Sequence, residues 1–295
     1  MLKRLWKKFG PNPLDQKLKR AVKQECRRIL IPWNRGLGDI ALGLYALVYR
    51  IRKAIPDARI TFVTRPDLAE GFKLLDNVET IIVKEWVRGR AVSLEEAVDL
   101  SAFDLILEDP DPSRWLRSQI GSLVPKLLWA PSWDEEWKRF GLEEREYVGV
   151  HVQTETQYPY EKNWLVKKWT QLFEQLTERQ EKEVLLFGLQ PTHSFPLPHV
   201  IDMRGKTTLF EMLSIIKNCC PYLIAPDSGV LSLTYFLAVS FPIRIVSLWA
   251  DPNQGVLKQA VSSPNPQLVH IPLFGRDQDI STIEVASVVE ALVGP

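Results

Sequence analysis

Apolar residues along this chain alternate between short continuous runs and stretches in which they recur every three or four positions. The short runs predict strands and the periodic stretches predict helices. In the first half, strands are expected at 28–33, 59–64, 80–84 and 103–107, and helices at 40–54, 67–75 and 113–122. In the second half, strands are expected at 147–152, 183–187, 221–225 and 243–248, and helices at 166–178, 209–217, 230–239 and 280–292.

This order of strands and helices predicts an α/β protein with parallel, doubly wound sheets. A charged, tryptophan-containing stretch at 131–146 interrupts the alternation and suggests a connection between two Rossmann-like domains. We expect these domains at 29–140 and 146–279, followed by a closing C-terminal helix at 280–295. A ligand is then expected in a central cleft, where the carboxyl ends of both sheets face each other.

Residues 1–28 differ from the rest of the chain in charge. They hold ten basic residues against Asp15 and Glu25, so their net charge is +8, and the other 267 residues must carry −7 to give the formal net charge of +1. Four apolar residues recur there at helical spacing, namely Leu2, Leu5, Trp6 and Phe9. Such a basic amphipathic segment predicts binding to an anionic membrane surface, with a solvated terminus or a helix packed on the body as alternatives. Nucleic-acid binding is disfavoured because the rest of the chain is acidic.

The composition favours a soluble or peripheral protein of the cytosol. The chain has 295 residues, of which 45% are hydrophobic, enough for packed cores and too many for a disordered chain. No apolar run reaches the roughly 18–20 residues that a membrane span needs. Three cysteines (Cys26, Cys219 and Cys220) cannot build a disulfide framework, and the four histidines lack zinc-type spacing, so no metal is assigned.

A glycine-rich segment joins the first predicted strand to the first helix. Gly36-Leu37-Gly38-Asp39-Ile40-Ala41 matches the dinucleotide fingerprint G-x-G-x-x-A, and Arg65 ends the second strand, where an NADP-binding protein contacts a 2′-phosphate. Asp39 opposes this interpretation, because its carboxylate would lie where the pyrophosphate must bind. Two alternatives remain. Asp39 either caps the helix or is a carboxylate at the cleft that acts as a base.

The second half contains two segments suited to a diphosphate. Asp227-Ser228-Gly229 follows a predicted strand and opens a helix whose N–H groups would bind phosphate, although Asp227 could be only a helix cap. Lys162 lies in a loop after another strand, where its ammonium could reach a leaving phosphate or could be solvated. Asp109-Pro110-Asp111 resembles the metal-binding D-x-D of some sugar transferases, but a strand-ending turn explains it as well. Neither a P-loop nor a G-x-S-x-G motif occurs.

Five segments, in order, resemble glycosyltransferase family 9, the ADP-heptose:lipopolysaccharide heptosyltransferases. The resemblance covers residues 28–293. The matching segments are Gly36-Leu37-Gly38-Asp39-Ile40-Ala41-Leu42, Pro56-Asp57-Ala58-Arg59-Ile60, Lys162-Asn163-Trp164 with Lys168-Trp169, Gly205-Lys206-Thr207-Thr208-Leu209, and Asp227-Ser228-Gly229-Val230-Leu231-Ser232-Leu233.

This resemblance implies the GT-B fold and metal-independent, inverting transfer of heptose from ADP-heptose. It also implies a lipopolysaccharide-core or other lipid-linked saccharide as acceptor, and a cytoplasmic protein that is peripheral on the inner face of the inner membrane. By position, Asp39 resembles the general base, and Lys162 resembles the residue that stabilises the leaving diphosphate. The nucleotide-sugar is expected to contact Thr154, Gln190, Thr207, Asp227, Ser228, Gly229 and Ser232.

Two positions depart from the family pattern, and both fall on the donor site. Ser232 stands where the family has a histidine, and Gln190 stands where it has an acid that holds the ribose. Three alternatives therefore stay open: a protein glycosyltransferase of the same fold, a catalytically inactive nucleotide-sugar-binding protein, and the NADP interpretation. The basic N-terminal segment favours a lipid-linked acceptor, and Asp39 together with Lys162 favours catalysis.

Overall fold

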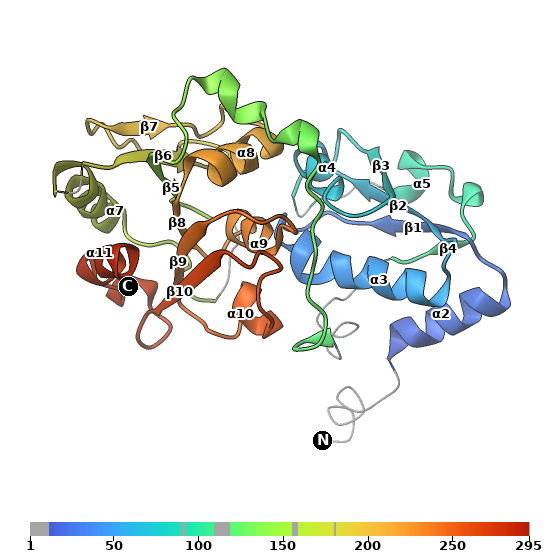
Figure 1. Cartoon of the computed structure of the whole chain (residues 1–295). Coiled ribbons are helices and arrows are strands. Elements are labelled where there is room, and N and C mark those ends of the chain that lie inside the picture. Colours follow the sequence, from blue (N-terminus) through green and yellow to red (C-terminus); the bar gives the residue numbers. More distant parts are fainter. Residues whose placement is uncertain are drawn as a thin grey trace. The chain divides into compact units, whose positions relative to one another are not determined.

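The computed structural model describes residues 12–88, 90, 93–108, 119–154, 159–179 and 181–294. Its internal contacts divide the chain into two compact units, Met1–Leu123 and Val124–Pro295. Each unit contains a parallel sheet with flanking helices (Figure 1), as the alternation of strands and helices predicts. No helix within the described ranges is long and apolar enough to cross a membrane.

The first unit is built on a four-stranded parallel sheet of order β3-β2-β1-β4. Its strands are β1 (Arg28–Pro32), β2 (Arg59–Thr64), β3 (Val78–Ile82) and β4 (Leu105–Ile106). Its helices are α2 (Pro13–Lys23), α3 (Tyr45–Ala54), α4 (Pro66–Phe72) and α5 (Leu94–Ala97), with a π-helix at Ile40–Leu44 and a 3-10 helix at Leu100–Ala102.

The central strand β1 is apolar throughout its middle and is buried on both faces, as expected for a sheet that helices cover on each side. Ile29, Leu30 and Ile31 are all fully buried. Leu30 belongs to an apolar cluster with Val63 of β2 and with Trp86. Because β1 leads directly into the glycine-rich segment, that segment lies at the carboxyl edge of the first sheet.

Part of the basic N-terminal segment is a helix packed against the first unit. Helix α2 begins after Asn12, whose Oδ1 accepts the Leu14 N–H at 3.0 Å and so caps the helix. Leu14 and Leu18 are buried, and α2 packs against α3 (Figure 1). For α2, the packed-helix alternative is therefore correct. Residues 1–11, which carry Leu2, Leu5, Trp6 and Phe9, lie outside the described residues.

The second unit is built on a six-stranded parallel sheet of order β10-β9-β8-β5-β6-β7. Its strands are β5 (Tyr147–His151), β6 (Glu183–Phe187), β7 (Val200–Asp202), β8 (Tyr222–Pro226), β9 (Ile243–Trp249) and β10 (Leu268–Phe274). Its helices are α7 (Val166–Glu174), α8 (Leu209–Cys219), α9 (Gly229–Phe236), α10 (Gly255–Gln259) and α11 (Val285–Val293). Shorter helical turns lie at Pro131–Trp133, Glu136–Phe140, Gln175–Arg179 and Ile280–Thr282.

One apolar cluster joins this sheet to two of its helices. Val148 of β5, Leu186 of β6 and Ile224 of β8 are buried together with Trp169 of α7 and Val288 of α11. The three strands are neighbours in the sheet, so the loops that follow them emerge side by side at its carboxyl edge. Ligands of α/β proteins bind at this edge.

Residues 131–146, the expected connection between domains, pack against helix α8 of the second unit. Trp133 stacks on Phe210 with ring centroids 3.9 Å apart, and Arg139 forms an ion pair with the buried Glu211. The division between the units, at Leu123 and Val124, lies upstream of that stretch.

The second sheet is wider than the sequence pattern predicts. The pattern misses both edge strands, because β7 has only three residues and β10 contains Pro272, a residue that edge strands tolerate. The closing helix predicted at 280–292 is also different. A 3-10 turn at Ile280–Thr282 comes first, and the α-helix begins only at Val285.

Candidate functional site

Asp227 and Lys162 form a buried ion pair at the carboxyl edge of the second sheet. Asp227 directly follows β8, and its Oδ2 lies 2.6 Å from the Lys162 Nζ. The Lys162 and Asp227 side chains are only 7% and 12% exposed. The sequence suggests a role in diphosphate binding for the Lys162 loop and, independently, for the segment that begins at Asp227. The ion pair brings these two segments together. Because each charge is buried, each depends on the other for compensation.

Gly255 packs against both the Asp227 carboxylate and the Trp249 ring. Gly255 has a φ of +49°, and a Cβ at this position would clash with the Asp227 Oδ1 and lie 2.7 Å from the Trp249 ring. Trp249 is 1% exposed and donates its indole N–H to the Ser247 Oγ at 2.6 Å. The position of Asp227 therefore requires a glycine at 255.

Helix α9 begins immediately after the ion pair. The Ser228 Oγ accepts the Leu231 N–H at 3.2 Å and caps the helix. The first helical residue, Gly229, has no side chain and is partly exposed. The partial positive charge of the helix N-terminus thus adjoins the Lys162–Asp227 pair, whose two charges balance. Helix N-termini bind anionic groups such as phosphates.

Ser232 lies one turn into α9 and is 1% exposed. Its hydroxyl donates to the Ser228 carbonyl at 3.0 Å, so the hydrogen of this hydroxyl is used within the helix. The contact between Ser232 and a donor stays a prediction.

The Asn163 side chain links the two ends of the loop after β5 through two hydrogen bonds to the Thr154 backbone. The Asn163 Oδ1 accepts the Thr154 N–H at 2.7 Å, and the Asn163 Nδ2 donates to the Thr154 carbonyl at 3.2 Å. These two bonds fix Thr154 beside Asn163, and Lys162 precedes Asn163. Residues 155–158 of this loop lie outside the described residues.

Gln190 and Thr207 lie in the loops that follow β6 and β7. Gln190 is exposed, whereas Thr207 is half-buried and directly precedes Thr208, the capping residue of α8. Arg204 links the two loops, since it follows β7 and donates to the carbonyl of His193 at 2.6 Å. The two predicted nucleotide contacts therefore belong to loops that are fixed to each other within the second unit.

His151, the last residue of β5, is buried near the start of the same loop. Burial lowers the pKa of its imidazole to about 4, because desolvation disfavours the charged form. Among the described residues, its Nδ1 has no hydrogen-bond partner. The imidazole is therefore neutral at pH 7 and adds no positive charge to the site.

Asp39 lies at the carboxyl edge of the first sheet, between β1 and the π-helix. Its Oδ2 accepts the Gly36 N–H at 3.0 Å, and its own N–H donates to the Gly36 carbonyl at 3.3 Å. Its side chain makes no capping hydrogen bond to the helix that follows, so the helix-cap alternative is wrong. The reciprocal bonds with Gly36 instead orient a carboxylate that is partly exposed.

Arg65, which the NADP interpretation assigns to a 2′-phosphate, is occupied within the first unit. It is 5% exposed, its Nε donates to Asp67 at 2.6 Å, and its Nη1 donates to the Asn34 Oδ1 at 2.9 Å. These contacts disfavour a role in binding NADP.

Within the described ranges, no three His, Cys, Asp or Glu side chains come together in a group that could hold a metal ion. Asp109-Pro110-Asp111 and most of the helix predicted at 113–122 lie outside those ranges. The site residues that sequence reasoning missed are Asn163, Trp249 and Gly255. Asn163 belongs to a segment that matches the family, so the sequence could have indicated it. No sequence motif marks Trp249 or Gly255, whose contacts with the site depend on how the loops fold.

Solved structures with a similar fold are bacterial glycosyltransferases. A glycosyltransferase family 9 structure from Veillonella parvula DSM 2008 matches with a TM-score of 0.64 and 18% identity over 90% of this chain and 95% of that one. The E. coli ADP-heptose lps heptosyltransferase II matches with a TM-score of 0.62 and 16% identity over 90% and 97%. The E. coli heptosyltransferase WaaC with ADP-2-deoxy-2-fluoro heptose matches with a TM-score of 0.55 and 14% identity over 90% and 98%.

No protein-family model matches the sequence, and no curated protein matches it either. The structural matches show the fold, an α/β architecture with two parallel sheets of the GT-B type found in family 9 glycosyltransferases. The fold predicted from the sequence is thereby confirmed.

Proposed function

We propose that this protein is an inverting glycosyltransferase with a nucleotide-sugar donor. The observation that carries the proposal is the buried Lys162–Asp227 ion pair at the start of α9, in a chain with the fold of family 9 glycosyltransferases. A nucleotide-sugar presents a diphosphate, and diphosphates bind to ammonium groups and to helix N-termini. This pair stands at the sheet edge where α/β proteins hold such ligands.

The proposed donor is ADP-heptose. Support comes from two similar structures, one named for ADP-heptose and one containing ADP-2-deoxy-2-fluoro heptose. In this proposal the diphosphate lies against Thr154, Ser228 and Gly229, while Gln190 and Thr207 contact the nucleoside. Asp227 holds the Lys162 ammonium in place and contacts the sugar or its phosphate.

The proposed reaction is a single displacement at the anomeric carbon. Asp39 takes the proton from an acceptor hydroxyl, whose oxygen then forms the new bond to that carbon. The bond from the anomeric carbon to the diphosphate oxygen breaks, and the electron pair leaves with the diphosphate. Lys162 and the N-terminus of α9 stabilise the charge that develops there, so no metal ion is required. One displacement inverts the configuration of the sugar.

The proposed acceptor is a lipid-linked saccharide of the lipopolysaccharide-core type, at the inner face of the inner membrane. The +8 net charge of residues 1–28 supports an acceptor at an anionic surface. A cytosolic protein acceptor gives no reason for that charge.

Two measurements test the proposal. Calorimetric titration with ADP, UDP and GDP should show tightest binding of ADP, and this binding should persist in EDTA. Incubation with ADP-heptose and heptose-deficient lipopolysaccharide should then yield a heptosylated product of inverted configuration. Absence of binding to all three nucleotides would overturn the donor site. Binding of UDP or GDP with exclusion of ADP would overturn the choice of donor.

A second candidate function is nucleotide-sugar binding without catalysis. Ser232 favours it, because the residue that replaces the family histidine is buried and donates its hydroxyl to the Ser228 carbonyl. Tight ADP binding without turnover, on both lipid-linked and protein acceptors, would select this candidate. Transfer to protein alone would instead select a protein glycosyltransferase.

A further inference from the structure

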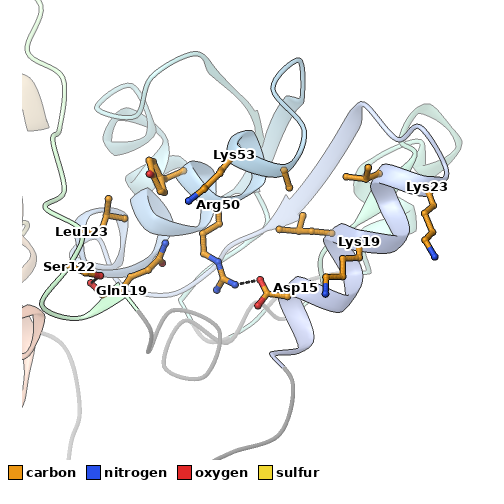
Figure 2. A pocket seen from close by; sticks show the side chains of 12 residues that line it. Asp15, Lys19, Lys23, Arg50, Lys53, Gln119, Ser122 and Leu123 are labelled. Atoms are coloured by element: carbon orange, nitrogen blue, oxygen red, sulfur yellow. Dashed lines mark hydrogen bonds and ion pairs between the residues drawn. The ribbon is translucent and has the colours of Figure 1, made fainter.

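A basic groove lies between helices α2 and α3 on the first unit. Its volume is about 830 Å³, and the two helices together with Gln119, Ser122 and Leu123 supply its lining. Figure 2 shows Lys19 and Lys23 reaching out from α2, and Arg50 and Lys53 from α3. None of the residues assigned above to donor binding or catalysis lines it.

The charges of the groove are unbalanced. Among the described residues, Asp15 is the one acidic lining residue, and it forms an ion pair with Arg50, as the dashed line in Figure 2 marks. Lys19, Lys23 and Lys53 are exposed, and in the described part of the chain none of them has an ion-pair partner. The lining therefore carries three uncompensated positive charges around one cavity.

Apolar side chains share the lining with these lysines. Val22 of α2 is 47% exposed and Tyr49 of α3 is 44% exposed, and the lining also includes the buried Leu18. Cationic groups beside exposed apolar and tyrosine side chains match the boundary between lipid headgroups and acyl chains. A purely aqueous anion site would have no use for the apolar residues.

The chain's own N-terminus is a poor occupant of this groove. Residues 1–11 include four basic residues and no acidic one, so they would repel the groove lysines. The same residues contain Leu2, Leu5, Trp6 and Phe9, which makes them similar to the groove in chemistry. The groove and the segment that precedes α2 therefore suit the same partner, an anionic bilayer.

We propose that the α2–α3 groove binds the phosphate headgroups of anionic phospholipids and so docks the first unit on a membrane surface. The inference deepens the proposed function, on which it rests for the membrane-bound acceptor. Each basic residue near an anionic surface strengthens binding about fivefold, so the three lysines together contribute about a hundredfold.

The test is co-sedimentation of the full-length chain with vesicles of phosphatidylcholine, with and without phosphatidylglycerol. The groove variant combines Lys19→Gln, Lys23→Gln and Lys53→Gln. A matched control combines Lys84→Gln, Lys126→Gln and Lys167→Gln, three lysines that are also exposed but lie outside the groove. A terminal variant replaces Lys3, Arg4, Lys7 and Lys8 by Gln.

We expect the wild type to bind only vesicles that contain phosphatidylglycerol. The groove variant should bind them about a hundredfold more weakly, and the control within about twofold of wild type. Equal losses in groove and control variants would overturn the proposal, as would a loss confined to the terminal variant. Val22→Ser with Tyr49→Ser should weaken binding further at moderate salt, because salt screens only the charges.

Two additional measurements complete the test. One distinguishes a lipid headgroup from a free anion, and the other distinguishes failure of the groove proposal from failure of the proposed function. In the first measurement, inorganic phosphate or glycerol 3-phosphate is added to the wild type and to the groove variant. If these anions stabilise only the wild type, while both proteins bind vesicles equally, the groove is a site for free anions and the lipid proposal is wrong. ADP titration of the groove variant should match wild type. A protein that binds vesicles through the groove but binds no nucleotide would refute the proposed function and leave this inference intact.

Discussion

Asp227 can occupy its position beside Lys162 only because residue 255 is a glycine. A Cβ at Gly255 would clash with the Asp227 Oδ1 and would also lie 2.7 Å from the Trp249 ring. The loop after β9 thereby fixes the loop after β8, and the ion pair in turn fixes Lys162 in the loop after β5. Three loops at one sheet edge are coupled through a single carboxylate.

Gly255→Ala is expected to disrupt this coupling. The alanine has to give up the φ of +49° or displace Asp227, so we expect a loss of about 2–4 kcal/mol in unfolding free energy and at least tenfold weaker ADP binding. Gly141→Ala is the matched control. Gly141 has a φ of +65° but nothing within 4 Å of a Cβ, so this variant should lose only about 1 kcal/mol and bind ADP normally. Equal effects in both variants would mean that backbone strain alone matters.

Lys162→Met is expected to destabilise the fold and weaken ADP binding together. The variant leaves Asp227 buried without its partner, which costs about 3–5 kcal/mol of unfolding free energy. Adding Asp227→Asn removes the uncompensated charge and should restore most of the stability. ADP binding should stay about 10–100-fold weaker in the double variant, because the ammonium is still missing. Full recovery of binding would show that Lys162 acts only as the partner of Asp227.

Asp39→Asn is expected to abolish most of the transfer and to leave the fold unchanged. The amide oxygen can still accept the Gly36 N–H, as Asp39 does at 3.0 Å, but the amide cannot take a proton from an acceptor. The rate should fall by about 10²–10⁴, measured with ADP-heptose and the lipid-linked acceptor. ADP affinity should change less than threefold, since Asp39 belongs to the first unit. Turnover close to wild type would exclude Asp39 as the base.

The sequence predicts this site only as far as strand order and motif position allow. Asp227 and Lys162 each follow a buried strand, and in a parallel sheet that alone places them at one edge. Their contact depends on how the loops fold, and so does the requirement for glycine at 255. No local pattern contains that information, because it arises from packing between loops that are distant in sequence.

Two elements near the ends of the chain, helix α2 and strand β10, are hard to recognise in the sequence for local reasons. Asn12 and Pro13 are start signals for a helix, yet the charge of residues 1–28 makes the whole segment resemble one basic tail. Pro272 breaks the pattern of β10 without preventing an edge strand.

Leu18→Ala is expected to lower the unfolding free energy of the protein by about 2–5 kcal/mol. Leu18 is 4% exposed where α2 packs on the first unit, so the substitution leaves a cavity. Val22→Ala on the same helix is the control, because Val22 is 47% exposed and should lose less than about 1 kcal/mol. Chemical denaturation of both variants measures the difference. Equal losses would mean that α2 contributes no packed core.

Mild acid is expected to destabilise the protein partly through His151. The pKa of this buried imidazole is about 4, below the value of about 6.5 for an unfolded histidine. Between these two values the unfolded state binds more protons than the folded state, so stability falls as pH falls. From pH 7 to 5 this group alone should remove about 2 kcal/mol of unfolding free energy.

His151→Leu should reduce the pH dependence of the unfolding free energy by that amount, whatever its effect on stability at pH 7, because the titrating group is gone. His193→Gln, which replaces an exposed histidine, is the control. An unchanged pH dependence in His151→Leu would show that folding does not lower the pKa of His151.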